Sequence, residues 1–206
     1  NIELNSSFSK HSFYNANGNV IDNSNEVVIE KFKAITGIKK RRYINDDQTV
    51  VDIAIEAAKK TILDAKLDQE SIDYIIVAHN VGDITLNSNQ VNTLPSLASK
   101  VKAGLSIKSP DCVAYDILFG CPGWVEGVIQ ATAFIKAGMA KKCLVLGADT
   151  LSRVLDHSDR DSMIYADGAG ASMIEASKGK GGILSHKTVT YTSEGEADFI
   201  FYGPSN

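Results

Sequence analysis

The segment YDILFGCPGWVEG, residues 115–127, carries the strongest structural signal in this chain. It begins as an apolar run of strand length and leads into Gly120 and Cys121. Pro122 and Gly123 then open a helix-like run, and Pro is favoured at the first helical position because its missing N–H would have no partner there. A strand that passes directly into a helix starts a strand–helix–strand unit, so the segment predicts an α/β protein.

The flanking sequence continues this alternation. Three apolar runs fit strands that are buried on both faces: Asp73–Ala78, Val113–Leu118 and Cys143–Ala148. Three segments have helical periodicity: Thr49–Ala65, Leu94–Ala103 and Pro122–Ala137. We also expect two short strands within Ser162–Ala176, around the turn Asp-Gly-Ala-Gly, and one strand at Gly182–Thr190. This order predicts parallel neighbouring strands with right-handed crossovers.

Composition and charge argue against several classes of protein. The chain has 206 residues, of which 44% are apolar and 22% charged, so it can bury a core and does not have the composition of a disordered protein. A net charge of −4 provides no general attraction for nucleic acid or for an anionic membrane. The apolar runs are too short to span a bilayer, and residues 1–10 lack the apolar core of a secretory signal. We therefore expect neither nucleic-acid nor membrane partners.

The three cysteines, Cys112, Cys121 and Cys143, follow no spacing typical of a metal or redox motif. Their odd number and spacing predict no metal site and favour a reducing, cytoplasmic compartment. Cys112 and Cys143 lie beside or inside apolar strands, where a cysteine acts as a small buried hydrophobe.

Cys121 has a position that favours chemistry. It lies between a strand and the first turn of a helix, where free N–H groups and the helix dipole stabilise a thiolate. The same N–H groups can hold the oxyanion that forms when the sulfur attacks a carbonyl. Gly120 and Gly123 permit a tight turn and the close approach of a substrate. The alternative interpretation is a buried structural cysteine, which is the commoner role of a free thiol.

Motifs on both sides of the Cys121 turn carry a resemblance to a known family. They are Thr36-Gly37-Ile38 followed by basic residues, Leu94-Pro95-Ser96, GADTLSR at 147–153, DHSDRD at 156–161 and YADGAGA at 165–171. In this order and spacing, over residues 36–177, the chain resembles β-ketoacyl-acyl carrier protein synthase III.

The resemblance implies a thiolase-like α/β fold, of which residues 1–206 form a single N-terminal domain. Such a half is a mixed, mostly parallel five-stranded sheet with helices on its faces, and the enzymes are homodimers. The implied activity takes an acyl group from an acyl-CoA or acyl-carrier-protein thioester. The enzyme condenses this group with malonyl-acyl carrier protein, with loss of CO2, in fatty acid or related lipid and polyketide biosynthesis. Acyl carrier protein and acyl-CoA are the implied partners, and no permanently bound cofactor or metal is implied.

The resemblance also assigns roles to single residues. Cys121 matches the nucleophile, and its own backbone N–H is one oxyanion donor. Arg160 matches an arginine that contacts coenzyme A, and Thr36 belongs to a motif of the same coenzyme A or carrier-protein site. The alternative for Arg160 is a solvated loop residue paired with Asp159 or Asp161.

Three further residues are implied to line the acyl pocket: Leu94, Leu151 and Phe119. Leu94 is expected to reach the partner subunit. Plain core packing is the alternative for both leucines. Phe119 stands, together with Pro122 and Trp124, where the family usually has small residues, and this difference would reshape the pocket.

Two departures from the family leave alternatives open. Among the four histidines, His11, His79, His157 and His186, none has the context of the family's catalytic His, and no Asn matches its partner. We expect this pair in a C-terminal half that is not present in these residues. The rival interpretations are a hydroxymethylglutaryl-CoA synthase or polyketide synthase relative, and a non-catalytic thiolase-like half that binds an acyl group or a protein.

The second departure concerns the donor. Lys31 and Ile35 occupy positions where relatives that use acetyl-CoA often carry Trp and Arg, so a carrier-protein thioester is the alternative donor. The basic run 39–42 is either a landing site for acyl carrier protein or coenzyme A phosphates, or a solvated turn.

Overall fold

The computed structural model describes residues 1–15, 17–88, 90–177, 179 and 182–196. The chain divides into two compact units, each formed by segments that are distant in the sequence. The first unit comprises Asn1–Tyr43, Leu151–Asp167 and, among the described residues that follow, Thr188–Glu196. The second comprises Ile44–Thr150 and Gly168–Lys187, and it contains Cys121.

A four-stranded sheet forms the centre of the second unit, in the order β6-β3-β7-β8. The strands are β3 (Tyr74–His79), β6 (Val113–Leu118), β7 (Lys142–Thr150) and β8 (Asp167–Glu175). Strand β3 is parallel to β6 and to β7. The N–H of Ala176 donates to the carbonyl of Lys141 at 3.0 Å, so β8 ends where β7 begins and the two strands run antiparallel. The sheet is therefore mixed and mostly parallel.

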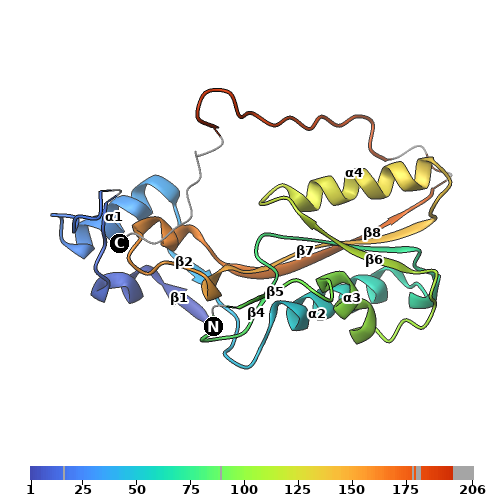
Figure 1. Ribbon diagram of the computed structural model, residues 1–206, viewed down its shortest axis with the longest axis horizontal. Coiled ribbons are helices and arrows are strands. Elements are labelled where there is room, and N and C mark those ends of the chain that lie inside the picture. Colours follow the sequence, from blue (N-terminus) through green and yellow to red (C-terminus); the bar gives the residue numbers. More distant parts are fainter. Residues whose placement is uncertain (16, 89, 178, 180–181, 197–206) are drawn as a thin grey trace. The chain divides into compact units, whose positions relative to one another are not determined.

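Helices cover both faces of this sheet (Figure 1). Helices α2 (Val50–Ala65) and α3 (Leu97–Gly104) pack on one face, and α4 (Gly123–Lys136) packs on the other. Side chains alternate along β3, since Ile75 and Val77 belong to the core under α2 and α3 whereas Ile76 belongs to the core under α4. All three are fully buried, which is why this strand has a continuous apolar sequence.

Local sequence sets the starts of the helices. Helix α2 begins after Thr49, which forms a capping box with Asp52. Helix α3 begins after Ser96, whose hydroxyl accepts a hydrogen bond from the Ser99 N–H at 3.1 Å. It therefore starts later than the predicted Leu94, because the residue before a proline is disfavoured in a helix.

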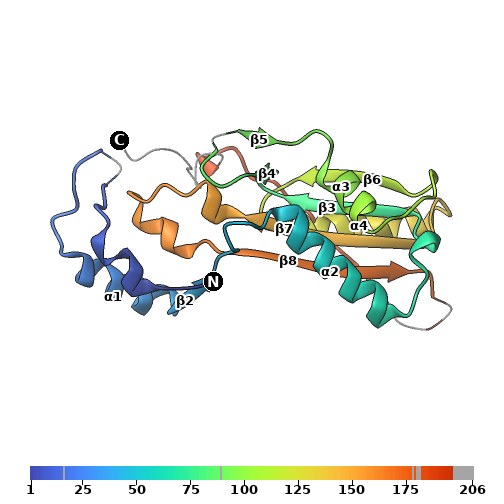
Figure 2. The same cartoon turned by 90° about the horizontal axis from the view of Figure 1, so that it is seen from below.

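A short hairpin joins β3 to α3 (Figure 2). Its strands β4 (Asp83–Ile84) and β5 (Val91–Asn92) pair antiparallel. The short 3-10 helix η2 (Gln69–Ser71) precedes β3.

The first unit has a core of its own. Strand β1 (Ile2–Leu4) pairs antiparallel with β2 (Lys40–Arg42), and η1 (Asn5–Lys10), α1 (Asn25–Thr36), η3 (Leu151–Arg153) and η4 (Arg160–Ile164) complete its elements. Its core residues are Phe8, Phe13, Val28, Ile29, Phe32 and Met163. Arg41 is buried with its guanidinium 4.9 Å from the centre of the Phe8 ring. The basic run 39–42 is therefore not a uniformly solvated turn, since one of its charges is part of the core.

Three strand predictions differ from the structure. Residues 182–190 contain no strand, and all of them are exposed, so no apolar contact holds them in a sheet. Ser162–Ala176 does not form two strands, because Gly168 and Gly170 lie within the single strand β8 instead of in a turn. The sheet formed by the described residues has four strands, whereas the family resemblance implied five. Among the described strands β6 lies at an edge of the sheet and has partly exposed residues, whereas its apolar sequence predicted burial on both faces.

Candidate active site

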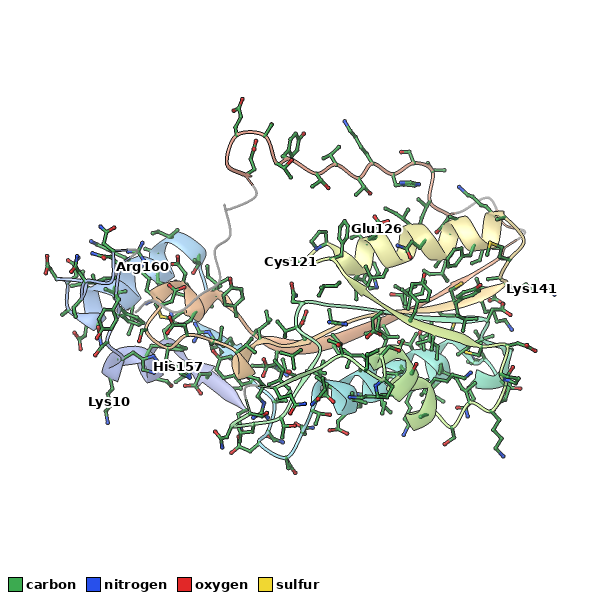
Figure 3. The ribbon with its side chains drawn as sticks, viewed as in Figure 1. Lys10, Cys121, Glu126, Lys141, His157 and Arg160 are labelled. Atoms are coloured by element: carbon green, nitrogen blue, oxygen red, sulfur yellow. The ribbon has the colours of Figure 1, made fainter. Side chains whose placement is uncertain are left out.

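Cys121 lies in the tight turn between β6 and α4, at the amino end of the helix (Figure 3). The N–H of Gly123 donates to the carbonyl of Gly120 at 2.9 Å and closes the turn around Cys121. Gly120 has a φ of 77°, in the left-handed region that favours glycine, so the turn needs glycine at this position. Cys121 is exposed, so a substrate can reach its sulfur.

Two glycines let α4 pack closely on the sheet. A Cβ on Gly123 would lie 2.8 Å from the Cβ of Ala78 on β3, and a Cβ on Gly127 would lie 2.8 Å from Cγ1 of Val145 on β7. Neither space admits a side chain without a shift of the sheet. The amino end of α4 is thus held against the end of β3, and this contact positions Cys121.

The other two cysteines have different surroundings. Cys112 and Cys143 are buried, and all three thiols are free. Burial raises the pKa of the Cys112 thiol, and it raises the pKa of the Cys143 thiol to about 11. Both thiols are covered, and both stay protonated near neutral pH. Cys121 is exposed and is therefore the accessible one of the three thiols.

Polar side chains gather where the parallel strands end. The backbone N–H and the side-chain amide of Asn80, just after β3, donate to the two carboxylate oxygens of Asp149 on β7 at 2.8 and 2.7 Å. Burial raises the pKa of Asp149, and the hydrogen bonds from Asn80 act in the opposite direction. His79 ends β3 and is buried, with Nε2 3.2 Å from Oδ2 of Asp116 on β6.

Our sequence reasoning missed Asn80, Asp116 and Asp149 as candidate site residues. The signal was present, because each polar residue interrupts or follows an apolar strand near its carboxyl end. Open α/β sheets place their functional residues at these ends.

The residues implied for coenzyme A binding lie in the first unit. Thr36 ends α1, where its hydroxyl donates to the carbonyl of Phe32 at 2.8 Å and accepts from the N–H of Ile38 at 3.1 Å. Through these two hydrogen bonds the Thr36 side chain stabilises the carboxyl end of α1. Arg160 begins η4 with an exposed side chain, and its Nε lies 3.7 Å from Oδ1 of Asp161. An exposed pair of this kind is weak, so the guanidinium can also meet a ligand.

The residues implied for the acyl pocket have unequal exposure. Phe119 is 40% exposed and lies two residues before Cys121, in the approach to the turn. Leu94 is 87% exposed, so the alternative of plain core packing is wrong for this residue. Leu151 begins η3 in the first unit and is partly buried.

The described residues contain no group of three or more His, Cys, Asp and Glu side chains that could hold a metal ion. Among the helices of this part of the chain, none combines the length and apolar character needed to cross a membrane.

Comparison with known proteins identifies the fold class and then a similar family. The solved 3-oxoacyl-[acyl-carrier-protein] synthase III from Aquifex aeolicus VF5 has a TM-score of 0.68 and 32% identity, covering 87% of this chain and 51% of that chain. The chain therefore has the thiolase-like fold of condensing enzymes. Residues 115–192, which include the Cys121 turn, match the model of the 3-oxoacyl-[acyl-carrier-protein] synthase III family. The chain is therefore similar to this family.

Two curated relatives support this similarity. Beta-ketoacyl-[acyl-carrier-protein] synthase III 1 of Vibrio parahaemolyticus is 40% identical over 168 residues, which cover 81% of this chain and 49% of the relative. The synthase III of Paracoccus denitrificans is 39% identical over 153 residues, which cover 74% of this chain and 44% of the relative. The chain spans about half the length of the curated relatives it matches.

Proposed function

We propose that this chain is the cysteine-bearing N-terminal half of a condensing acyltransferase and that Cys121 is its nucleophile. The exposed thiol at the amino end of α4 carries the proposal. Cys112 and Cys143 are buried and cannot meet a thioester without local unfolding. The amino end of a helix offers unpaired N–H groups to a thiolate and to an oxyanion beside it.

The first step in this proposal is acyl transfer to Cys121. The thiolate sulfur attacks the carbonyl carbon of the thioester and forms a new C–S bond, while the carbonyl oxygen becomes an oxyanion. The backbone N–H of Cys121 is the proposed oxyanion donor. Collapse of this intermediate breaks the C–S bond to the donor, whose thiolate leaves and takes a proton from solvent. The products are acyl-Cys121 and the free thiol of coenzyme A or of the carrier protein.

The second step is condensation with malonyl-acyl carrier protein and loss of CO2, within fatty acid or related lipid biosynthesis. This step requires the His and Asn pair that the family resemblance places in a C-terminal half. The coverage of about half of each relative supports that division. Neither His79, buried against Asp116, nor the exposed His186 has a context that suggests this role.

Other parts of the proposal have narrower support. Arg160 is proposed as a contact to coenzyme A or the carrier protein because its guanidinium is exposed, planar and always charged. Leu94 and Phe119 are proposed for the acyl pocket because both present apolar surface to solvent. A cytoplasmic location is proposed on the three free thiols.

Acyl uptake from a thioester tests the proposed nucleophile. We expect incubation with acetyl-CoA to add one acetyl group to the chain, measured by intact-protein mass spectrometry, and peptide mapping to locate it on Cys121. Cys121→Ser removes the uptake and Cys112→Ser, the matched control, retains it. Uptake that persists in Cys121→Ser places the nucleophile elsewhere. A wild-type chain that takes up no acyl group from acetyl-CoA or from acetyl-acyl carrier protein favours the non-catalytic binding role.

A further inference from the structure

We propose that His79 and Asp116 form a clamp on the segment that carries Leu94, and that this clamp determines which acyl groups the enzyme accepts. The clamped segment is the hairpin connection between β3 and α3, described at residues 82–88 and 90–96. The inference rests on the proposed function, because Leu94 lines an acyl pocket only in an acyltransferase. In this proposal His79 and Asp116 are positioning residues.

The hydrogen bonds of His79 define its protonation. Its Nδ1 lies 3.0 Å from the backbone N of Gly82, and its Nε2 lies 3.2 Å from Oδ2 of Asp116. A backbone N–H can only donate, so Nδ1 is the acceptor and the imidazole carries its proton on Nε2. The Nε2–H then donates to the Asp116 carboxylate. The ring is 5% exposed, so both bonds are shielded from water.

Asp116 links the same imidazole to the start of α3. Its Oδ2 accepts from the N–H of Leu97 at 2.7 Å, and its Oδ1 accepts from the N–H of Ala98 at 2.8 Å. These residues are the first two of α3, whose N–H groups have no partner within the helix. The carboxylate therefore fixes the residue at which the clamped segment ends.

The clamp thus holds the segment at both of its ends. His79 binds the first residue, Gly82, and Asp116 binds the two residues that follow the last, Ser96. Gly82 has a φ of 76°, and a Cβ there would lie 3.1 Å from the carbonyl oxygen of Asn92, so the two arms of the hairpin are closely packed. A further ion pair, Lys100 Nζ to Asp83 Oδ2 at 2.9 Å, ties α3 to the first arm.

Leu94 depends on this arrangement for its position. Its side chain is 87% exposed, so packing against the body of the second unit does little to hold it. Its place is set by the backbone of the segment, which the clamp anchors on both sides. A small displacement of a pocket residue changes the fit of an acyl chain by more than it changes the chemistry of the thioester.

Two variants of His79 separate the two bonds of the clamp. In His79→Asn the side-chain oxygen replaces Nδ1 and accepts from Gly82, but the donor to Asp116 is lost. In His79→Gln the amide nitrogen replaces Nε2 and donates to Asp116, but the acceptor for Gly82 is lost. His186→Asn is the matched control, because His186 is exposed in the extended residues 182–190.

Hydrogen–deuterium exchange tests the clamp without any reaction. We expect faster exchange of the Gly82 amide in His79→Gln, and of the Leu97 and Ala98 amides in His79→Asn, with no change in His186→Asn. Exchange in both His79 variants that equals the wild type overturns the clamp.

Acyl selection is tested with acetyl-, butyryl- and octanoyl-CoA as separate donors to Cys121. We expect both His79 variants to change the ratio of the octanoyl to the acetyl transfer rate by about threefold or more, and His186→Asn to leave it unchanged. This ratio does not depend on the fraction of folded chain. Wild-type transfer combined with unchanged ratios in the His79 variants overturns the proposal. A wild-type chain that accepts none of the donors contradicts the proposed function instead, and the exchange data still judge the clamp.

Discussion

At the scale of the residue, the three cysteines of this chain have two kinds of surroundings. Cys112 and Cys143 are buried in the two cores that lie on opposite faces of the sheet, where desolvation keeps their thiols protonated. Cys121 is exposed at the amino end of a helix. The difference follows from position alone, because the same side chain packs as a hydrophobe when it is covered and acts as a nucleophile when it is reachable and ionised.

We predict that iodoacetamide modifies Cys121 selectively in the folded chain. At pH 7.5 the thiolate is the reactive form, and the pKa of Cys143, about 11, leaves it protonated as well as covered. Peptide mass spectrometry after timed alkylation measures the three rates. The thiolate fraction of Cys143 grows as the pH rises toward its pKa of about 11, so its reactivity increases with pH.

The matched control for this experiment is Cys121→Ser. In this variant we expect no rapid modification at pH 7.5, since the two remaining thiols are buried. Equal rates at the three cysteines of a folded wild-type sample are incompatible with Cys121 as the nucleophile.

At the scale of the element, α4 follows the turn that holds the proposed nucleophile, and glycine determines how closely the helix approaches the sheet. Gly123 and Gly127 are four residues apart, so they share one face of α4. That face meets Ala78 on β3 and Val145 on β7. Glycine in a helix costs about 1 kcal/mol relative to alanine. The close packing of α4 on the sheet requires glycine at these positions despite this cost.

We predict that Gly127→Ala destabilises the chain despite the better helix propensity of alanine. The added Cβ would lie 2.8 Å from a buried Val145 methyl group, and overpacking of a core costs about 1–3 kcal/mol. A decrease of about 1–2 kcal/mol in the free energy of unfolding is expected from urea denaturation, after allowance for the gain in propensity.

Gly168→Ala is the control for this prediction, because a Cβ on Gly168 would have no heavy atom within 4 Å. We expect it to unfold at the wild-type urea concentration or above. An unchanged or raised stability of Gly127→Ala would mean that α4 can move away from the sheet without loss.

At the scale of the whole molecule, strand β6 gives the sheet of the second unit an edge with exposed apolar side chains. β6 has a neighbour only on one side among the described residues, and its terminal residues Val113 and Leu118 are 44% and 72% exposed. An open edge with apolar side chains is a template for pairing with another strand. This exposure supports the homodimer implied by the family resemblance.

We predict that the chain self-associates through this edge. Light scattering is expected to give the mass of a dimer, and Leu118→Lys is expected to shift the sample toward monomer because a charge on an edge strand opposes pairing. Leu184→Lys is the control, since Leu184 is 95% exposed and lies outside every strand described. A monomeric wild type, or equal effects of the two variants, contradicts pairing through β6.

The sequence alone determined the parts of this protein that depend on neighbours along the chain. The α/β class and the succession of α2, β3, α3, β6, the Cys121 turn, α4 and β7 follow from periodicity and from the short-range effects of glycine and proline. Helix α1, the strands β1 and β2 and the β4–β5 hairpin were not predicted. The expectation of a nucleophilic Cys121 also came from its place before a helix. The two strands expected within 162–176 and the strand expected at 182–190 were wrong, because a glycine-containing run can be extended and an apolar run needs a partner strand.

The tertiary structure alone determined which residues meet across the fold. It divided the chain into two units, made β6 an edge and exposed Leu94. It also brought His79 to Asp116, which lies 37 residues away. No local pattern encodes such a contact, because the geometry that joins these side chains exists only after parallel strands have paired and helices have packed on the sheet.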